Sequence, residues 1–327
     1  MQSNWPAQAE AWLNTWTDDR LVVSPPGEGN GYWAGAPYLL ADGDTLYLYY
    51  RLRRPRGEGR GYEVRIAASS DAEHFTDVWR LRKEELGTSS VERGALVRTR
   101  AGFRLYLSYV DPERGQWRTD ACEAPTVAAL DVAKRFAVVE PWRLGLEAAK
   151  DPVLVPDGSG WKMLVSCSVS TEPVDHSRLH GGQDVFTTGL VTSPTGLLVS
   201  EDGRRFTWRG TVLTPDPGHW DAYITRVTTA IPSRRGGYLC LYDGGESVEQ
   251  NYEEIASFAV SPDLTHFEKF PGPGPRLRVS EGTGTWRYGS AERFQGQLFL
   301  AYERARADGS HELRMTRVGE VDVDAGH

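Results

Sequence analysis

Charged residues stand at the start of four of five similar segments, and they are the residues in this sequence best suited to chemistry. Two are carboxylates and four are cations, and two aromatic residues accompany them: Glu92, Arg93, Lys150, Asp151, Arg226, Arg287, Trp33 and Tyr288. Carboxylates held close together among cations acquire different pKa values, as general acid–base chemistry requires. The alternative is a set of structural ion pairs, because a buried charge is costly unless it is paired.

Weaker candidates lie elsewhere in the chain. Arg51 and Asp243 end strand-like segments, so their side chains are candidates for the same place, although a turn-capping role is favoured for Asp243, which precedes two glycines. His180 is a lone loop histidine, for which a surface position is favoured over catalysis. The chain contains no Walker loop, GxSxG, HExxH or zinc-type spacing. We therefore expect no metal and no cofactor.

The segments that carry these residues form a repeat. Each unit has a short apolar strand, a turn, an alternating second strand and a third strand, which is typical of antiparallel sheet. Units start near residues 35, 92, 150, 226 and 287. Taking Ala36, Arg93, Asp151, Val227 and Tyr288 as equivalent gives intervals of 57, 58, 76 and 61 residues. This period predicts an all-β fold, a five-bladed β-propeller with four-stranded antiparallel blades around a central channel.

The propeller prediction places the charged residues together, because the first strand of each blade lines the channel and begins at one mouth. The third unit is longer by an insertion within residues 168–186, and such insertions commonly build one wall of a site. Three Ser/Asp-containing turns, at residues 70–75, 200–206 and 261–267, are expected to be structural hairpins. We expect one domain, 1–327, with residues 1–30 as a lead-in that also offers a candidate closing strand.

The composition of the chain indicates which classes of binding partner are unfavourable. The net charge of −8 argues against a nucleic-acid surface or an anionic membrane surface. No apolar run is long enough to span a membrane, and no signal peptide is recognised, so a cytoplasmic protein is expected. Cys122, Cys167 and Cys240 are widely separated, which favours buried free thiols in a reducing compartment. The sequence predicts no particular oligomeric state.

Two motifs resemble the five-bladed β-propeller glycosidase superfamily, which includes glycoside hydrolase families 43, 32, 62, 68 and 130, and in particular a bacterial glycosidase-like branch. They are Ala36-Pro37-Tyr38-Leu39-Leu40 before Asp42-Gly43, and Lys150-Asp151-Pro152-Val153-Leu154 before Asp157-Gly158. The three hairpins and Gly218-His219-Trp220-Asp221 add to the resemblance, which covers residues 30–318.

The resemblance implies a carbohydrate ligand and three channel carboxylates. In the family, an Asp on the first blade is base or nucleophile, an Asp on the third tunes pKa values, and a Glu near the fourth is the acid. Only Asp151 matches, at the third blade. Ala36 occupies the first-blade position, and Arg226 and Val227 supply no carboxylate on the fourth.

We therefore expect a glycoside hydrolase-like enzyme at the channel mouth. Asp151 and Glu92 would perform acid–base work, with Asp243 as a third group. Cations would bind a hydroxyl-rich or anionic sugar, and two aromatic residues would stack on it: Arg51, Arg93, Lys150, Arg226, Arg287, Trp33 and Tyr288. The alternatives are a non-catalytic carbohydrate-binding propeller and a glycoside phosphorylase in which phosphate is the nucleophile. An open pocket with the two carboxyls about 5–10 Å apart would favour the enzyme, whereas carboxylates locked to cations without a cavity would favour structural ion pairs.

Overall fold

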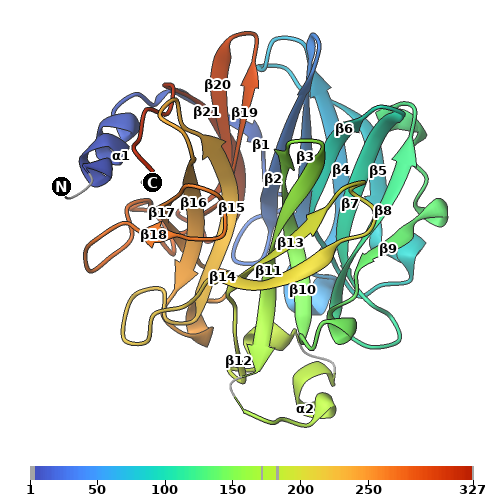
Figure 1. The fold of residues 1–327 in the computed structure, drawn as a ribbon. Coiled ribbons are helices and arrows are strands. Elements are labelled where there is room, and N and C mark those ends of the chain that lie inside the picture. The colour runs from blue at the N-terminus through green and yellow to red at the C-terminus, as the bar shows by residue number, and fades with distance from the viewer. Residues whose placement is uncertain (1–3, 171, 182–183, 326–327) are drawn as a thin grey trace.

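The computed structural model describes residues 4–170, 172–181 and 184–325, and it is built mainly from β-strands, as expected (Figure 1). The two α-helices in this part of the chain are α1 (Trp5–Leu13) and the short α2 (His176–His180). Among the described residues, no helix has the length and apolar character needed to cross a bilayer.

The strands fall into five antiparallel sets of four. The first set contains β2 (Trp33–Asp42), β3 (Thr45–Arg53), β4 (Gly61–Ser69) and β5 (Thr76–Arg82). The second contains β6 (Val91–Thr99), β7 (Gly102–Val110), β8 (Trp117–Ala124) and β9 (Phe136–Val139). The third contains β10 (Ala148–Asp157), β11 (Gly160–Ser170), β13 (Thr195–Ser200) and β14 (Thr207–Leu213), with β12 (Val191–Thr192) beside β11.

The last two sets differ in how they are completed. The fourth contains β15 (Ile224–Pro232), β16 (Tyr238–Gly245), β17 (Ile255–Ser261) and β18 (Glu268–Lys269). The fifth contains β19 (Trp286–Phe294), β20 (Gln297–Ala305) and β21 (His311–Val318), and β1 (Thr17–Val23) pairs with β21 as its fourth strand. The expected closing strand from the lead-in is therefore present as β1.

The five sets are arranged in a ring order. Their first strands contact one another in sequence, β2 with β6, β6 with β10, β10 with β15, β15 with β19 and β19 with β2. A single parallel pair, Trp33 with His311, also joins the first set to the fifth, so these two sets form one eight-stranded sheet.

Apolar side chains fill the space between neighbouring sets, because successive residues of a strand point to opposite faces of the sheet and strands such as β7 are buried along their whole length. Ile66 of β4 packs in one cluster with Leu105 of β7, and Phe258 of β17 packs in another with Leu300 of β20. The helix α1 joins the second of these clusters through Trp12, whose ring lies 6.1 Å from that of Phe258. Each fully buried apolar side chain of this size stabilises the fold by about 1.5–3 kcal/mol.

The three Ser/Asp turns are structural hairpins, as predicted. In the first, the carboxylate of Asp71 accepts hydrogen bonds from the backbone N–H groups of Glu73 and His74, both at 2.8 Å. Asp202 and Asp263 hold the equivalent turns in the same way. Such local bonds satisfy backbone donors that the strands leave free.

Candidate functional site

Most of the predicted site residues lie at or beside β-bulges in the five inner strands, whereas Arg51 and Asp243 lie on the neighbouring strands β3 and β16. Each of these strands breaks register with its neighbour at a similar place, for example between Lys150 and Val153 in β10 and between Arg287 and Ser290 in β19. Ala36, Asp151 and Tyr288 have φ angles of 53°, 58° and 57° at their bulges. A bulge turns side chains out of the regular alternation, and here it directs a ring of polar groups inward.

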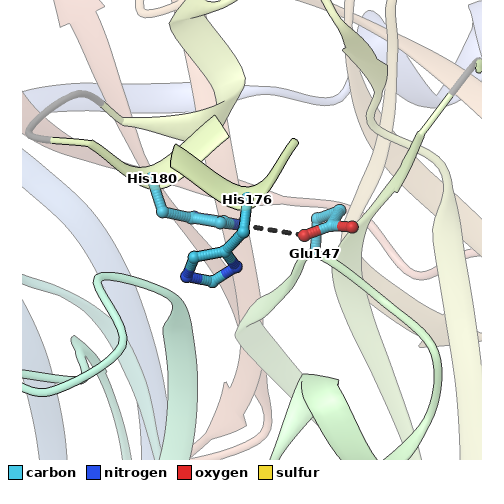
Figure 2. Close-up of side chains that lie close together, drawn as sticks. All are labelled: Glu147, His176 and His180. Carbon is cyan, nitrogen blue, oxygen red and sulfur yellow. Dashed lines mark hydrogen bonds and ion pairs between the residues drawn. The ribbon is translucent and has the colours of Figure 1, made fainter. Parts of the chain in front are cut away.

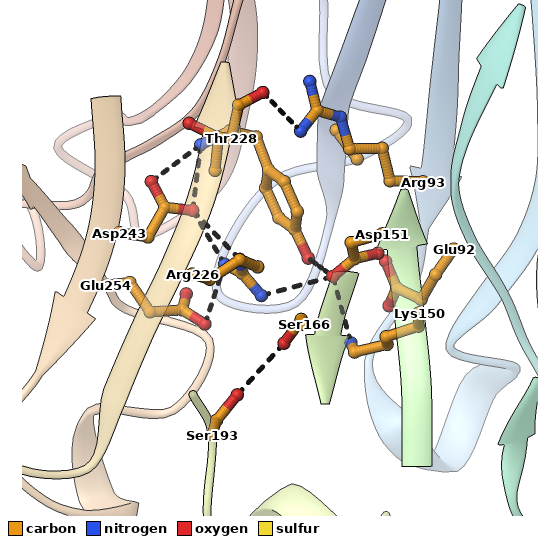
Figure 3. Close-up of polar contacts among 12 residues, drawn as sticks. Glu92, Arg93, Lys150, Asp151, Ser166, Ser193, Arg226, Thr228, Asp243 and Glu254 are labelled. Carbon is orange, nitrogen blue, oxygen red and sulfur yellow. Dashed lines mark hydrogen bonds and ion pairs between the residues drawn. The ribbon is translucent and has the colours of Figure 1, made fainter. Parts of the chain in front are cut away.

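Asp151 lies at the centre of this ring and is completely buried (Figure 3). Its Oδ2 atom is 3.4 Å from Arg226 Nη1, 3.6 Å from Lys150 Nζ and 3.3 Å from the Tyr288 hydroxyl, which donates to it. Its Oδ1 atom has no hydrogen-bond partner among the described residues. A buried carboxylate oxygen without a hydrogen-bond donor costs free energy. This unsatisfied oxygen distinguishes Asp151 from the other carboxylates of the ring.

Glu92 is locked to cations. It forms a close ion pair with Arg51, and its second oxygen is 3.8 Å from Arg53 Nη1. Burial would raise the pKa of Glu92, but Arg51, Lys150 and Arg53 together outweigh it and lower the pKa, so the carboxylate is ionised. The setting of Glu92 is therefore that of a structural ion pair.

Asp243 and Glu254 share Arg226. Arg226 Nη2 is 2.8 Å from Asp243 Oδ2 and 3.1 Å from Glu254 Oε1. Burial raises the pKa of Asp243 to about 6, with Glu254 adding to this and Arg226 opposing it. Burial also acts to raise the pKa of Glu254, but Arg287 and Arg226 lower it to about 2. The pKa values of these two neighbouring carboxyl groups are therefore well separated, as is typical of sites where one group acts as an acid and another as a base.

Asp243 also has a structural contact. Both of its oxygens lie 3.1 Å from the backbone nitrogen of Tyr288, which donates to them at the bulge of the next set. In the same way, Oε2 of Glu303 on β20 accepts a hydrogen bond from the backbone N–H of Ala36 at 3.1 Å. The other oxygen of Glu303 pairs with Arg287 at 2.6 Å. A Cβ atom at Gly35 would lie 1.9 Å from Glu303 Oε2, so the absence of a side chain there admits the carboxylate.

Arg93 lies in a different setting from the one expected for a substrate-binding cation. It is fully buried and donates to the backbone carbonyls of Pro37, Thr228 and Gly289 at 2.9, 2.8 and 3.1 Å. These carbonyls belong to β2, β15 and β19, so one side chain from β6 ties four inner strands together. Burial lowers the pKa of Arg93.

The two aromatic residues are also enclosed. Trp33 stacks on His311 with ring centroids 4.5 Å apart, and the guanidinium of Arg287 lies 4.9 Å from its ring. Tyr288 has the Arg226 guanidinium 4.1 Å from its ring. Both side chains are at most 3% exposed, so neither offers a free face for a sugar in this conformation.

Residues from two loops pack against one another next to the ring. Asp184, in the insertion, accepts hydrogen bonds from Trp117 at 2.9 Å and from the Tyr252 hydroxyl at 2.6 Å, and it pairs with Arg60 at 2.7 Å. Burial opposes the ionisation of Asp184, yet Arg60 and Lys150 hold its pKa well below the usual range. Lys150 Nζ lies between the rings of Trp117 and Phe186, at 4.7 and 5.0 Å. The insertion therefore covers the ring.

An open pocket of about 410 Å³ adjoins this cover. It is lined by Arg56, Arg60, Lys83, Trp117, His180 and Asp184, among others. Three of these are cations, so the pocket has a basic wall. It lies beside the ring, because Trp117 lines the pocket and its ring is 4.7 Å from Lys150 Nζ.

Several residues of the site were not predicted. Glu254 belongs to an acidic stretch of sequence typical of a solvated loop, but it is 1% exposed. Glu303 ends a second strand as Asp243 does, so alignment of the second strands offered a signal for it. Asp184 and Tyr252 lie in loops whose docking has no local pattern in the sequence.

Comparisons with known proteins give the fold. Neither a protein-family model nor a curated protein sequence matches the chain. Among solved structures, a β-1,2-mannobiose phosphorylase from Listeria innocua is 16% identical, covers 91% of this chain and 93% of its own, and has a TM-score of 0.61.

Two further structures agree with this. BT0996, solved as a complex with RGII, is 13% identical, with 100% of this chain and 98% of that protein covered and a TM-score of 0.68. The β-xylosidase RS223 is 12% identical, with 93% and 98% covered and a TM-score of 0.59. At such identities the likeness shows the fold, and it confirms at that level the resemblance to propeller glycosidases seen in the sequence.

Proposed function

We propose that residues 1–327 form one five-bladed β-propeller domain that acts as a glycoside hydrolase-like enzyme. Five sets of four strands, with first strands in contact in ring order, support the blade assignment. Glycoside hydrolases and phosphorylases share the fold at more than 90% coverage of this chain, which supports a carbohydrate-active enzyme.

The observation that carries the catalytic proposal is the unpartnered oxygen of Asp151. This Oδ1 atom is buried, and the described part of the chain supplies no donor for it. A ligand hydroxyl or a water molecule would supply the missing donor, which accounts for the retention of a costly group. The ion pair of Glu92 with Arg51 needs no ligand to explain it.

We assign the roles from this difference. Asp151 is the base that takes a proton from the attacking water, and Asp243, with its pKa raised to about 6, is the acid that protonates the departing glycosidic oxygen. The anomeric carbon exchanges its bond to the leaving oxygen for one to the water oxygen. Glu92 and Glu254 stay ionised and fix the cations around the ring.

Access to the ring requires a movement of the cover. Asp151 and Glu92 are at most 1% exposed, and the hydrogen bond between Tyr252 and Asp184 lies in the cover. We propose that the segments carrying these two residues separate when a sugar enters. Closure over the bound sugar would then exclude water from the carboxylates.

The test is a screen of aryl-glycosides and oligosaccharides with the wild type and three variants. Asp151→Asn and Asp243→Asn should each lower kcat/KM by at least about 100-fold, with unchanged circular dichroism. Glu92→Gln removes one partner of a buried ion pair, so it should lower stability rather than the rate of the chemical step. Glu63→Gln is the matched control, because Glu63 is also buried and paired with arginines but lies on β4. Full activity of Asp151→Asn would refute the assignment.

Phosphorolysis is a second candidate, favoured by the pocket with three cations beside the ring. Inorganic phosphate would bind there through Arg56, Arg60 and Lys83 and attack the sugar in place of water. A strict requirement for phosphate in the screen would establish this reaction. Cleavage that proceeds equally without phosphate would exclude it.

Non-catalytic binding is the third candidate, and its basis is Ala36 at the first-blade position, where the family has an Asp. It predicts heat of binding in calorimetry with no bond cleavage over days. Measurable turnover that Asp151→Asn abolishes would exclude it.

A further inference from the structure

A second polar cluster lies outside the ring, where the insertion of the third set meets the start of β10. It consists of Glu147, His176 and His180, and one potential ligand atom of each lies within 4.8 Å of those of the other two (Figure 2). The histidines project from α2, which lies beyond one end of the sheets (Figures 1 and 2). They are four residues apart, so one face of the helix presents both.

The three side chains face one another. His180 Nε2 is 2.9 Å from Glu147 Oε2, and the two imidazole rings have centroids 4.6 Å apart. The side chain of His180 is 1% exposed, that of Glu147 is 28% exposed, and His176 is exposed to solvent. The cluster therefore has a buried floor and one open side.

We propose that Glu147, His176 and His180 bind a divalent transition-metal ion, and that Zn²⁺ is the best match. Two imidazoles and one carboxylate are a donor set typical of Zn²⁺, whereas Mg²⁺ and Ca²⁺ prefer oxygen ligands alone. Zinc bonds of about 2.0–2.2 Å place tetrahedral ligand atoms about 3.4 Å apart. His180 Nε2 and Glu147 Oε2 are 2.9 Å apart and all three ligand atoms lie within 4.8 Å of one another, so small side-chain rotations would complete the site, with a water molecule in the fourth position.

The sequence did not indicate this site, because its ligands are split. His180 has the sequence setting of a lone loop histidine, and Glu147 precedes the insertion by many residues. The pair His180–Glu147 alone would be an ordinary buried contact. The third ligand, His176, has no other assigned role in the described structure, and its position against the pair points to an ion.

The ion would have a positional effect. Glu147 directly precedes β10, the strand that carries Lys150 and Asp151. His180 lines the pocket that also contains Asp184, which covers the ring. A metal ion bound to Glu147 and His180 would hold the insertion against the start of β10. This inference does not depend on the proposed enzymatic function.

The test is a Zn²⁺ titration of the tag-free, metal-stripped chain, followed by calorimetry and thermal unfolding. We expect one Zn²⁺ per chain and a higher unfolding temperature with Zn²⁺ than with EDTA. His176→Ala and Glu147→Gln should each weaken binding at least about 10-fold. Co²⁺ should give the visible absorption of a tetrahedral ion in the wild type but not in His176→Ala.

His74→Ala is the matched control. His74 is 87% exposed and lies 2.8 Å from Asp71, and the described residues place no third ligand beside this pair, so its loss should leave binding unchanged. Because His176 is exposed, its replacement should not disturb folding, and it is the decisive variant. Absence of Zn²⁺ binding at about 100 µM, or binding unaffected by His176→Ala, would overturn the proposal.

Discussion

Replacing Arg93 by methionine tests whether this residue is structural or binds substrate. Methionine keeps much of the apolar stem but removes three charged hydrogen bonds, those to Pro37, Thr228 and Gly289. Each such bond contributes about 1.5–3 kcal/mol, and each orphaned carbonyl costs about 1–3 kcal/mol. The variant also avoids the cost of burying the guanidinium. We therefore expect the free energy of unfolding to fall by about 4 kcal/mol, from the lower end of these values.

The assay is urea unfolding followed by tryptophan fluorescence. With an m-value of about 3 kcal/mol/M, a loss of 4 kcal/mol lowers the midpoint by about 1.3 M. Arg98→Met is the control, because Arg98 lies on the same strand and pairs with Asp42 at 47% exposure. It should change stability by less than about 1 kcal/mol. A change that small in Arg93→Met, together with a weakened affinity for sugar, would refute the structural role.

Two other predictions use the shifted pKa values. Because the folded pKa of Asp243 is about 6 and its ordinary value is 3.8, the folded chain holds this proton more tightly. This proton contributes about 3 kcal/mol to the free energy of unfolding. The contribution is fully present below pH 3.8 and is lost as the pH rises through 6. Asp243→Asn should remove this pH dependence, and a variant whose unfolding free energy varies with pH as in the wild type would contradict the prediction. Burial raises the pKa of the Cys122 and Cys167 thiols to about 12 and raises that of Cys240 as well. Thiol reagents should therefore modify no cysteine in the folded chain and three after denaturation, and rapid native labelling would show that the burial is wrong.

The strands were predictable because their signal is local. Residues 46–51 were predicted as an alternating strand and residues 103–109 as its counterpart in the second repeat, and they lie within β3 (Thr45–Arg53) and β7 (Gly102–Val110). The recurrence of such pairs indicated five sets. The free, buried cysteines were likewise predicted, since nothing in their spacing offered a partner, and all three are buried and unpaired.

The ring was only partly predictable. The repeat correctly indicated that Asp151 and Arg226 would meet, and they lie 3.4 Å apart. It could not indicate which carboxylate pairs with which cation, because this depends on strand register and on loops such as the one that ends at Glu254. The structural role of Arg93 was also not predictable, because the three backbone carbonyls that accept its hydrogen bonds belong to strands far apart in the chain. The enclosure of the ring residues depends on the docking of Asp184, which no local pattern encodes.

The pairing of β1 with β21 has a consequence for synthesis. Arg314 on β21 binds Asp19 on β1, and these residues are 295 positions apart. The ribosome therefore synthesises Thr17–Val23 long before β21, and β1 lacks this partner until β21 has emerged. Contacts so distant in sequence form slowly, and a waiting strand edge can pair with other nascent chains. Completion of the fifth set therefore has to wait for the synthesis of β21, and until then the edge of β1 is open to wrong partners.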